Sequence, residues 1–218
     1  MKKLMLLGLG LVIGLTGCNV IHTASGVKGS GVMKMEKRSP ASFTALDVSC
    51  AGSIQVRFQE QTNLEISGDD NILPLITSEV RNDTLYIKST KDYDPKSKLQ
   101  IVVSIPNLNK FVFAGAGEVD LSNVKNERLE IVMSGAGSLQ ASGETKEADI
   151  SLTGAGSVDA KNLQAVNAKV DSTGVGSVDL YATGQLDAKA SGVGEINYYG
   201  NPKTVNRKVG GIGSINAK

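Results

Sequence analysis

Glycines are the residues in this sequence whose spacing most resembles a chemical motif. Six copies of the phrase Gly-x-Gly, each followed by Ser or Glu and then an aliphatic residue, recur along the second half of the chain. Paired glycines can cradle a phosphate, but nucleotide-binding loops add a third glycine or a Gly-Lys-Ser/Thr ending, and none of the six copies does so. We therefore interpret them as structural corners, where glycine allows a positive φ and close approach between backbones. The corner glycines are Gly115, Gly117, Gly135, Gly137, Gly154, Gly156, Gly174, Gly176, Gly192, Gly194, Gly211 and Gly213.

Acidic and amide side chains recur five residues after the first glycine of each copy. If the copies stack, they form a ladder of Asp120, Gln140, Asp159, Asp179, Asn197 and Asn216. Amides in such a ladder can hydrogen-bond along the stack. Asp159 and Asp179 would lie about 5 Å apart, where like charges repel, so they either point into water or share a hard cation such as Ca²⁺. The nine-residue repeat of Ca²⁺-binding β-rolls is missing, which favours solvated carboxylates over a metal site.

A second ladder of polar residues lies five residues before each first glycine. It runs through Lys110, Glu130, Asp149, Lys169, Asp187 and Asn206. The signs of charge partly alternate, so neighbours can pair. Exposed pairs contribute well under about 1 kcal/mol each, and we expect them to support register and solubility rather than chemistry.

Residues suited to nucleophilic or metal chemistry are scarce. The one histidine, His22, lies ahead of the strand-rich region, which excludes a Ser-His-Asp triad or a His-based zinc site from that region. Cys50 alternates in phase with Leu46 and Val48, which favours a small buried core residue over a nucleophile. We expect no catalytic residue, metal ligand or cofactor.

Carbohydrate chemistry needs paired carboxylates or an aromatic platform. Paired carboxylates could serve a glycosidase, but nothing singles out one pair among the many acids. The candidate aromatic residues are Tyr181, Tyr198 and Tyr199. Packing at a corner is the favoured role for these tyrosines, with a sugar-stacking surface as the alternative.

The elements that would position these residues follow from the repeat itself. The copies begin 18–20 residues apart, too close for crossover helices, so an ordinary βαβ sheet is excluded. Apolar residues alternate before each corner, as in Leu129, Ile131 and Met133, and after it, as in Val119 and Leu121. This pattern predicts an all-β, right-handed parallel β-helix with about six regular coils over residues 111–218. For residues 31–110 we predict an N-terminal β part of the same domain with irregular coils.

The N-terminal residues resemble a lipoprotein leader. Lys2 and Lys3 precede an apolar stretch over residues 4–15 that is too short to span a bilayer. The sequence Leu-Thr-Gly-Cys that ends at Cys18 resembles the lipobox of bacterial lipoproteins. We therefore predict a signal peptide over residues 1–17, a lipid on Cys18 and a flexible tether over residues 18–30; an ordinary signal peptide is the alternative.

The net charge of the chain limits the kinds of molecule that it could recruit by electrostatic attraction. Without residues 1–17 the chain has 21 basic and 22 acidic residues and a formal net charge of −1. Such a balance argues against nucleic acid or anionic lipid as a partner recruited by charge.

Several segments together resemble one known family, the head GIN domain family. They are the phrases that begin at Gly29, Phe43, Leu64 and Glu79 and the closing Gly-Glu-Ile-Asn and Gly-Ser-Ile-Asn. The resemblance covers about residues 31–218. The family is described as the heads of auto-transporter adhesins and is common in Bacteroidetes lipoproteins, so the resemblance implies a β-helical fold and an envelope location. It supplies no catalytic residues.

These observations favour a non-enzymatic, lipid-anchored envelope protein that binds a glycan, peptidoglycan or another protein. The alternatives are a polysaccharide-active β-helical enzyme and a structural or sensory accessory. Enzymes of that kind carry Arg, Lys and Asp clusters beside aromatics on one face, which the regular coils lack. The residues after Cys18 lack an acidic cluster resembling a surface-export signal, so we expect an outer-membrane lipoprotein that faces the periplasm.

A Cys18→Ala change should move the protein from the membrane fraction to a soluble or precursor form, because the thiol that would carry the lipid is gone. Cell fractionation and immunoblotting check this outcome. A processed variant that still needs detergent for extraction would contradict the lipoprotein interpretation.

Overall fold

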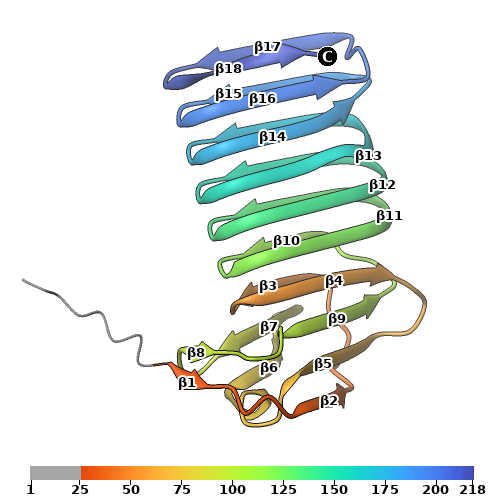
Figure 1. The fold of residues 1–218 in the computed structure, drawn as a ribbon. Helices are drawn as coiled ribbons and strands as arrows, with labels where there is room; N and C mark the ends of the chain where they lie inside the picture. Colours follow the sequence, from red (N-terminus) through yellow and green to blue (C-terminus); the bar gives the residue numbers. More distant parts are fainter. Residues whose placement is uncertain (1–25) are drawn as a thin grey trace, which may run out of the picture.

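The computed structural model describes residues 26–218, which form a nearly all-β solenoid (Figure 1). The predicted signal peptide, Cys18 and His22 lie outside the described residues. Strands stack in parallel along the solenoid, and the N-terminal strands cover one end of it (Figure 1). The parallel β-helix expected from the repeat is confirmed; its right-handedness stays a prediction.

The regular coils are built from nine parallel strands. These are β10 (Lys110–Phe113), β11 (Ala116–Met133), β12 (Ala136–Leu152), β13 (Ala155–Ser172), β14 (Val175–Ala182), β15 (Gln185–Ala190), β16 (Val193–Tyr199), β17 (Thr204–Val209) and β18 (Ile212–Ala217). Equivalent residues of neighbouring coils pair directly, so that Ala116 pairs with Ala136 and Ala136 with Ala155. The solenoid has about five turns, which roughly matches the predicted number of about six coils.

The interior of the coils is filled by the alternating aliphatic residues that the sequence placed there. Leu129, Ile131 and Met133 before a corner are all buried, as are Val119 and Leu121 after it. The same positions of the next coils hold smaller residues such as Ala148 and Ala168, also buried. A coil of about 19 residues encloses little space, and small side chains fill it without strain.

A third buried segment, present in several coils, has no counterpart among the elements predicted from the sequence. It lies between the two predicted strands and contributes Val124, Leu163, Ala165 and Ala182 to the core. Here the pairing shifts register, for example between Leu121 and Val124. An irregular insertion breaks the period-2 pattern, so alternation alone could not reveal this segment.

The N-terminal part covers the solenoid with mixed strands. Its elements are β1 (Val27–Lys28), β2 (Met33–Arg38), β3 (Ala45–Ser49), β4 (Gly52–Phe58), β5 (Asn63–Asp69), a 3₁₀ turn (Leu73–Leu75), β6 (Ile76–Arg81), β7 (Thr84–Ser89), β8 (Tyr93–Asp94) and β9 (Gln100–Ile105). Strands β3 and β4 still stack in parallel on β10 and β11, so the sheets continue across residue 110. By contrast β2, β5 and β9 pair antiparallel, as do β6 and β7. Within residues 26–218 no helix is long and apolar enough to cross a membrane.

The hairpin between β6 and β7 follows from its turn residues. Asn82 and Asp83 both have positive φ, 48° and 61°. A two-residue turn with positive φ at both positions matches the twist of the flanking strands, and Asn and Asp tolerate this conformation better than other side chains. Asn82 and Asp83 thus fix the hairpin that joins β6 to β7.

The boundary predicted for the tether at residue 30 is wrong, because residues 26–30 lie against the body of the protein. Strand β1 pairs with β8, and the Asn71 side chain bonds both Lys28 O (2.7 Å) and the Ser30 backbone N–H (2.9 Å). The carboxylate of Asp69 accepts a hydrogen bond from Gly31 N–H at 2.9 Å. Small and polar residues suggested a tether, but here they are the hydrogen-bonding partners of a docked segment.

The two glycines of each corner are constrained differently. The second glycine has a positive φ in five of the six copies, between 139° at Gly117 and 150° at Gly156. The first glycine is instead limited by space: a Cβ on Gly154 would collide with the carbonyl oxygen of Gly135 in the preceding coil. Each corner therefore rests directly on the backbone of its neighbour.

A Gly154→Val change should lower the free energy of unfolding by about 2 kcal/mol or more, because the new side chain must push two coils apart. Gly210→Val is the matched control: a Cβ there meets only Ser191 Oγ at 3.8 Å, and we expect a change within about 0.5 kcal/mol. Urea unfolding of both variants measures the difference. Equal stability of the two variants would refute the close-contact account of the corner.

The pH dependence of stability should reveal the role of Asp69. Its burial opposes the charged form, but hydrogen bonds from the backbone N–H groups of Ser97, Lys96 and Gly31 outweigh burial and hold the pKa of Asp69 below its ordinary value. A carboxyl with a lowered folded pKa stabilises the protein above its unfolded pKa of about 3.9, and this stability is lost as pH falls through the folded pKa.

Asp69→Asn should therefore lower the melting temperature at pH 7 and flatten its decline below about pH 4. Asp70→Asn serves as the control, because Asp70 is exposed and accepts one hydrogen bond from Ser30 Oγ. Thermal melts from pH 7 to acid conditions test this. A D69N profile parallel to that of the wild type would show that Asp69 carries no such linkage.

Candidate functional site

The ladder of acidic and amide side chains runs along an outward face of the solenoid. The predicted pairing of Asp120, Gln140, Asp159, Asp179, Asn197 and Asn216 is present in the register of β11, β12, β13, β14, β16 and β18. The same row continues past the regular coils through Gln55, Val102, Glu65 and Lys37. We call the outward side of these strands the amide face; it is one unbroken sheet surface from β2 to β18.

Hydrogen bonds along the amide face link successive coils. Asn216 Nδ2 donates to Asn197 Oδ1 at 3.2 Å, and Asn197 Nδ2 donates to Asp179 Oδ1 at 2.9 Å. Asn197 is buried although it lies on the outer side of the sheet. The amides thus bond along the stack in the way that the sequence predicted.

The neighbouring carboxylates Asp159 and Asp179 are compensated by side chains of the protein. Lys161 Nζ lies 2.8 Å from Asp159 Oδ2. Asp179 accepts the hydrogen bond from Asn197 Nδ2. Hydrogen bonding to Asp159, with a smaller contribution from the charge of Asp179, raises the pKa of Lys161. Lys161 therefore supplies the positive charge that a shared cation would otherwise supply, and within residues 26–218 no group of three His, Cys, Asp or Glu side chains could hold a metal ion.

A shallow hollow of about 380 Å³ lies on the amide face where β9, β4, β11 and β12 run side by side. Polar side chains from successive strands line it: Gln100, Gln55, Asp120 and Gln140. Glu118 at its edge pairs with Lys98 at 2.7 Å, and this hydrogen bond holds the pKa of Glu118 below its usual value. The hollow thus offers a row of amide donors and acceptors with few free charges.

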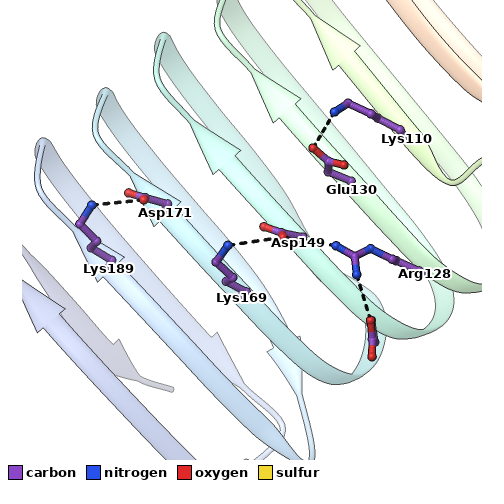
Figure 2. A network of polar contacts seen from close by, with 8 residues as sticks. Lys110, Arg128, Glu130, Asp149, Lys169, Asp171 and Lys189 are labelled. Carbon is purple, nitrogen blue, oxygen red and sulfur yellow. Dashed lines mark hydrogen bonds and ion pairs between the residues drawn. The ribbon is translucent and has the colours of Figure 1, made fainter. Parts of the chain in front are cut away.

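The second ladder forms ion pairs between coils, as Figure 2 shows. Lys110 Nζ lies 2.8 Å from Glu130, and Lys169 Nζ lies 3.6 Å from Asp149. Farther along, Asn206 Nδ2 donates to Asp187 at 2.6 Å. These side chains are mostly half-exposed, so each pair adds little stability. Their alternation can nevertheless disfavour a shifted register, because a shift would bring like charges together.

Two tyrosines lie next to each other on another outward row. The register aligns Lys125, Glu144, Gln164, Tyr181 and Tyr199 across five coils. Tyr198 is buried in the core, whereas Tyr181 and Tyr199 are half-buried and outward. We call this set the tyrosine row. All of its members except Tyr199 line a shallow hollow of about 460 Å³.

The position of Tyr181 depends on a glycine. Gly200 has a φ of 92°, and a Cβ there would lie 2.8 Å from Tyr181 Cε1. The ring therefore packs beside bare backbone, which fixes it at the corner. Tyr181 thus packs at a corner and remains partly accessible to solvent.

Cys50 lies in the core as the alternation of its segment predicted. Burial raises the pKa of its thiol to about 11, so almost no thiolate forms at neutral pH. The neighbouring Tyr93 hydroxyl donates a hydrogen bond to Ala51 O. This environment suits an inert core residue and not a nucleophile.

Comparisons with known proteins fit this architecture. Residues 42–202 match the family model described as "Putative auto-transporter adhesin, head GIN domain". A crystal structure of a Bacteroides fragilis protein described as a "putative adhesin" is similar, with a TM-score of 0.74 and 27% identity over 88% of this chain and all of that chain.

A second crystal structure, of a Parabacteroides distasonis protein described as a "putative lipid binding protein", shares the fold. Its TM-score is 0.54 at 23% identity, over 88% of this chain and 99% of that chain. No curated protein matches the chain.

Removing the charge of Lys161 should expose the repulsion between Asp159 and Asp179. We expect Lys161→Met to lower the melting temperature at low salt and to recover most of it when salt or millimolar Ca²⁺ is added, because both screen or bridge the carboxylates. Lys189→Met is the matched control, since Lys189 pairs with Asp171 alone, at 3.2 Å. The same salt response in both variants would contradict a shared role for Lys161.

Proposed function

The chain belongs to the head GIN domain family, and from this membership we propose that it is a non-enzymatic, lipid-anchored protein of the outer membrane that binds an extended partner along its outer faces. The similarity to proteins described as adhesins supports a binding role in the cell envelope. The lipobox-like sequence at Cys18 supports the anchor, and the non-acidic residues after it support a periplasm-facing orientation.

The observation that carries this proposal is the repetition of like side chains at a constant step. Neighbouring coils lie about 4.8 Å apart, and the pairing keeps equivalent residues such as Asp120 and Gln140 directly beside each other. A surface with this repeat presents the same groups to a partner several times in a line. An extended glycan or peptidoglycan strand has a matching repetitive character.

The tyrosine row is the part of this surface best suited to a sugar. Tyr181 and Tyr199 provide two adjacent aromatic groups, and Gln164 in the same row offers an amide donor and acceptor. An apolar ring face beside orienting polar groups is the usual composition of a small-molecule site. The amide face adds further donors and acceptors along the same axis.

Three carboxyl groups of the protein are held in the charged form by hydrogen bonds, which suits structure and binding rather than proton donation. A glycosidase needs a general acid with a raised pKa. In residues 26–218 the carboxyl groups with a resolved shift have a lowered pKa instead: Asp69, Glu79 and Glu118. Glu79 and Glu118 each owe the shift chiefly to a hydrogen bond from a basic partner, Arg81 or Lys98. A polysaccharide-active enzyme remains the alternative function.

The experiment is a binding assay with purified envelope polymers: peptidoglycan sacculi, lipopolysaccharide and capsular polysaccharide. We expect wild-type protein to co-sediment with at least one polymer and the Tyr181→Ala/Tyr199→Ala variant to bind at least tenfold more weakly, which corresponds to about 1.4 kcal/mol. Tyr86→Ala is the control, because Tyr86 lies in the N-terminal part on β7.

Two results would contradict the proposal. Release of new reducing ends or unsaturated products from any polymer would make the protein an enzyme. Binding that is unchanged in the double tyrosine variant would move the contact away from the tyrosine row. Protease accessibility on intact cells tests the orientation separately, because a periplasm-facing protein should be protected until the outer membrane is permeabilised.

A further inference from the structure

One exposed apolar cluster lies at the start of strand β2, where the amide face ends. Val32, Met33 and Met35 are 59%, 58% and 57% exposed. Single exposed aliphatic residues are normal, but three within four positions of the chain form a patch. Val32 directly precedes β2, and Met33 and Met35 lie in it. Strand β2 pairs only with β5 among the described strands, so this patch lies on an edge strand at the end of the sheet (Figure 1).

The two methionines of the patch share one face of the edge strand. Successive side chains in a strand point to opposite faces, so Met33 and Met35 lie on the side of Lys37, and Lys34 lies on the other side. Lys34 and Lys37 are exposed as well, and Lys37 Nζ lies 3.1 Å from Glu65. The rim formed by residues 32–35 is therefore apolar on the face of the two methionines and carries lysine at its border. We call it the β2 rim.

The β2 rim lies at the end of the solenoid where the chain enters the fold. Strand β1 docks on β8 at that end, and Gly31 is held by Asp69 directly before β2 (Figure 1). Gly26 follows Cys18 by eight steps along the chain, which span at most about 28 Å when fully extended. A lipid on Cys18 would hold this end of the solenoid close to the bilayer.

We propose that the β2 rim is a second membrane contact, in which Val32, Met33 and Met35 enter the headgroup region of the bilayer that carries the lipid anchor. This inference rests on the lipid anchor of the proposed function. Apolar side chains that enter the interface with lysines beside them match the composition of interfacial membrane-binding segments, because the lysine stems can lie along the apolar region while the ammonium groups reach the phosphates.

A second copy of the chain is a poorer occupant of the same edge. Lysines on an edge strand oppose pairing with an identical edge, and Lys34 and Lys37 occupy this one. The lipid contact is driven by apolar burial, which is consistent with the near-zero net charge of the chain without residues 1–17. Contact between the β2 rim and lipid would orient the solenoid. The β2 end rests on the membrane, and the β18 end points away from the lipid. The two tyrosines of the tyrosine row lie nearer to the β18 end.

The test uses the absence of tryptophan from the chain. Met35→Trp places one tryptophan in the β2 rim, and Ile212→Trp places one at another exposed apolar position, at the other end of the solenoid. Lipidated protein is reconstituted into phosphatidylcholine vesicles with brominated acyl chains. We expect the M35W emission to shift to the blue and to be quenched severalfold more strongly than that of I212W.

A second vesicle experiment distinguishes a missing contact of the β2 rim from a missing lipid on Cys18. Residues 19–218 with an N-terminal histidine tag are tethered to vesicles that contain a nickel-chelating lipid, so that membrane proximity no longer depends on Cys18. Quenching of M35W in this experiment supports the β2 rim contact even if native lipidation fails. Vesicle-bound protein with equal quenching at positions 35 and 212 in both experiments would overturn the proposal.

A blue shift without quenching by bromine, growing with protein density, would mean that copies of the chain pair through β2, and would also overturn it. Met33→Ser in the M35W background should reduce the quenching, since it removes a neighbouring apolar side chain without touching the core.

Discussion

The contact between the backbones of successive glycine corners is the constraint on which the rest of this structure depends. Carbonyl oxygens of one corner lie where the Cβ atoms of the next would be, as between Gly135 and Gly154. At the same corners a backbone N–H donates to the coil before it, for example Val175 to Gly154 O at 3.0 Å. Because no side chain fits between them, neighbouring coils meet at one register. A shift by one residue would place a Cβ in this contact and turn the aliphatic core residues outward.

That single register explains the outer surface as well as the core. Once the corners are aligned, the residues in register on either side of each corner are aligned too, and so Asn197 bonds Asp179, Lys169 meets Asp149 and Tyr199 lies beside Tyr181. None of these pairs contributes much energy alone. Their value is in presenting like groups in lines along the solenoid axis, which is the property that the proposed binding role uses. The N-terminal strands end this stack at one side and join it to the chain segment that leads to Cys18.

Much of the solenoid could be predicted from the sequence, because a strict period exposes both core and corner. The glycine spacing, the inward aliphatic residues and both ladders follow from counting residues relative to Gly115 and its equivalents. The third buried segment did not, because the register shift near Val124 breaks the alternation. The antiparallel pairing of β2 with β5 has no periodic signal at all, since each strand occurs once.

Site features were harder to predict where they depend on contacts between distant segments. Asp69 lies in a Gly-Asp-Asp-Asn run that resembles an ordinary turn, and only the fold brings it to Gly31 and Lys96. The same contact fixed the N-terminal segment that composition had suggested was a tether. Lys161 was also missed: it lies in the irregular part of its coil, so counting from the corner gave no reason to place it beside Asp159.

Amide hydrogen exchange at the corners measures the central constraint most directly. The N–H groups of Ala136, Ala155, Val175 and Val193 each donate to the first glycine of the preceding corner, although their side chains are exposed. If the corners hold the register, these amides should exchange as slowly as the strand amides of Ile131 and Ile150. Exchange at both places would then require the whole stack to open. Exchange at the corners that is orders of magnitude faster than in those strands would show that the corners fray independently and that the register is held elsewhere.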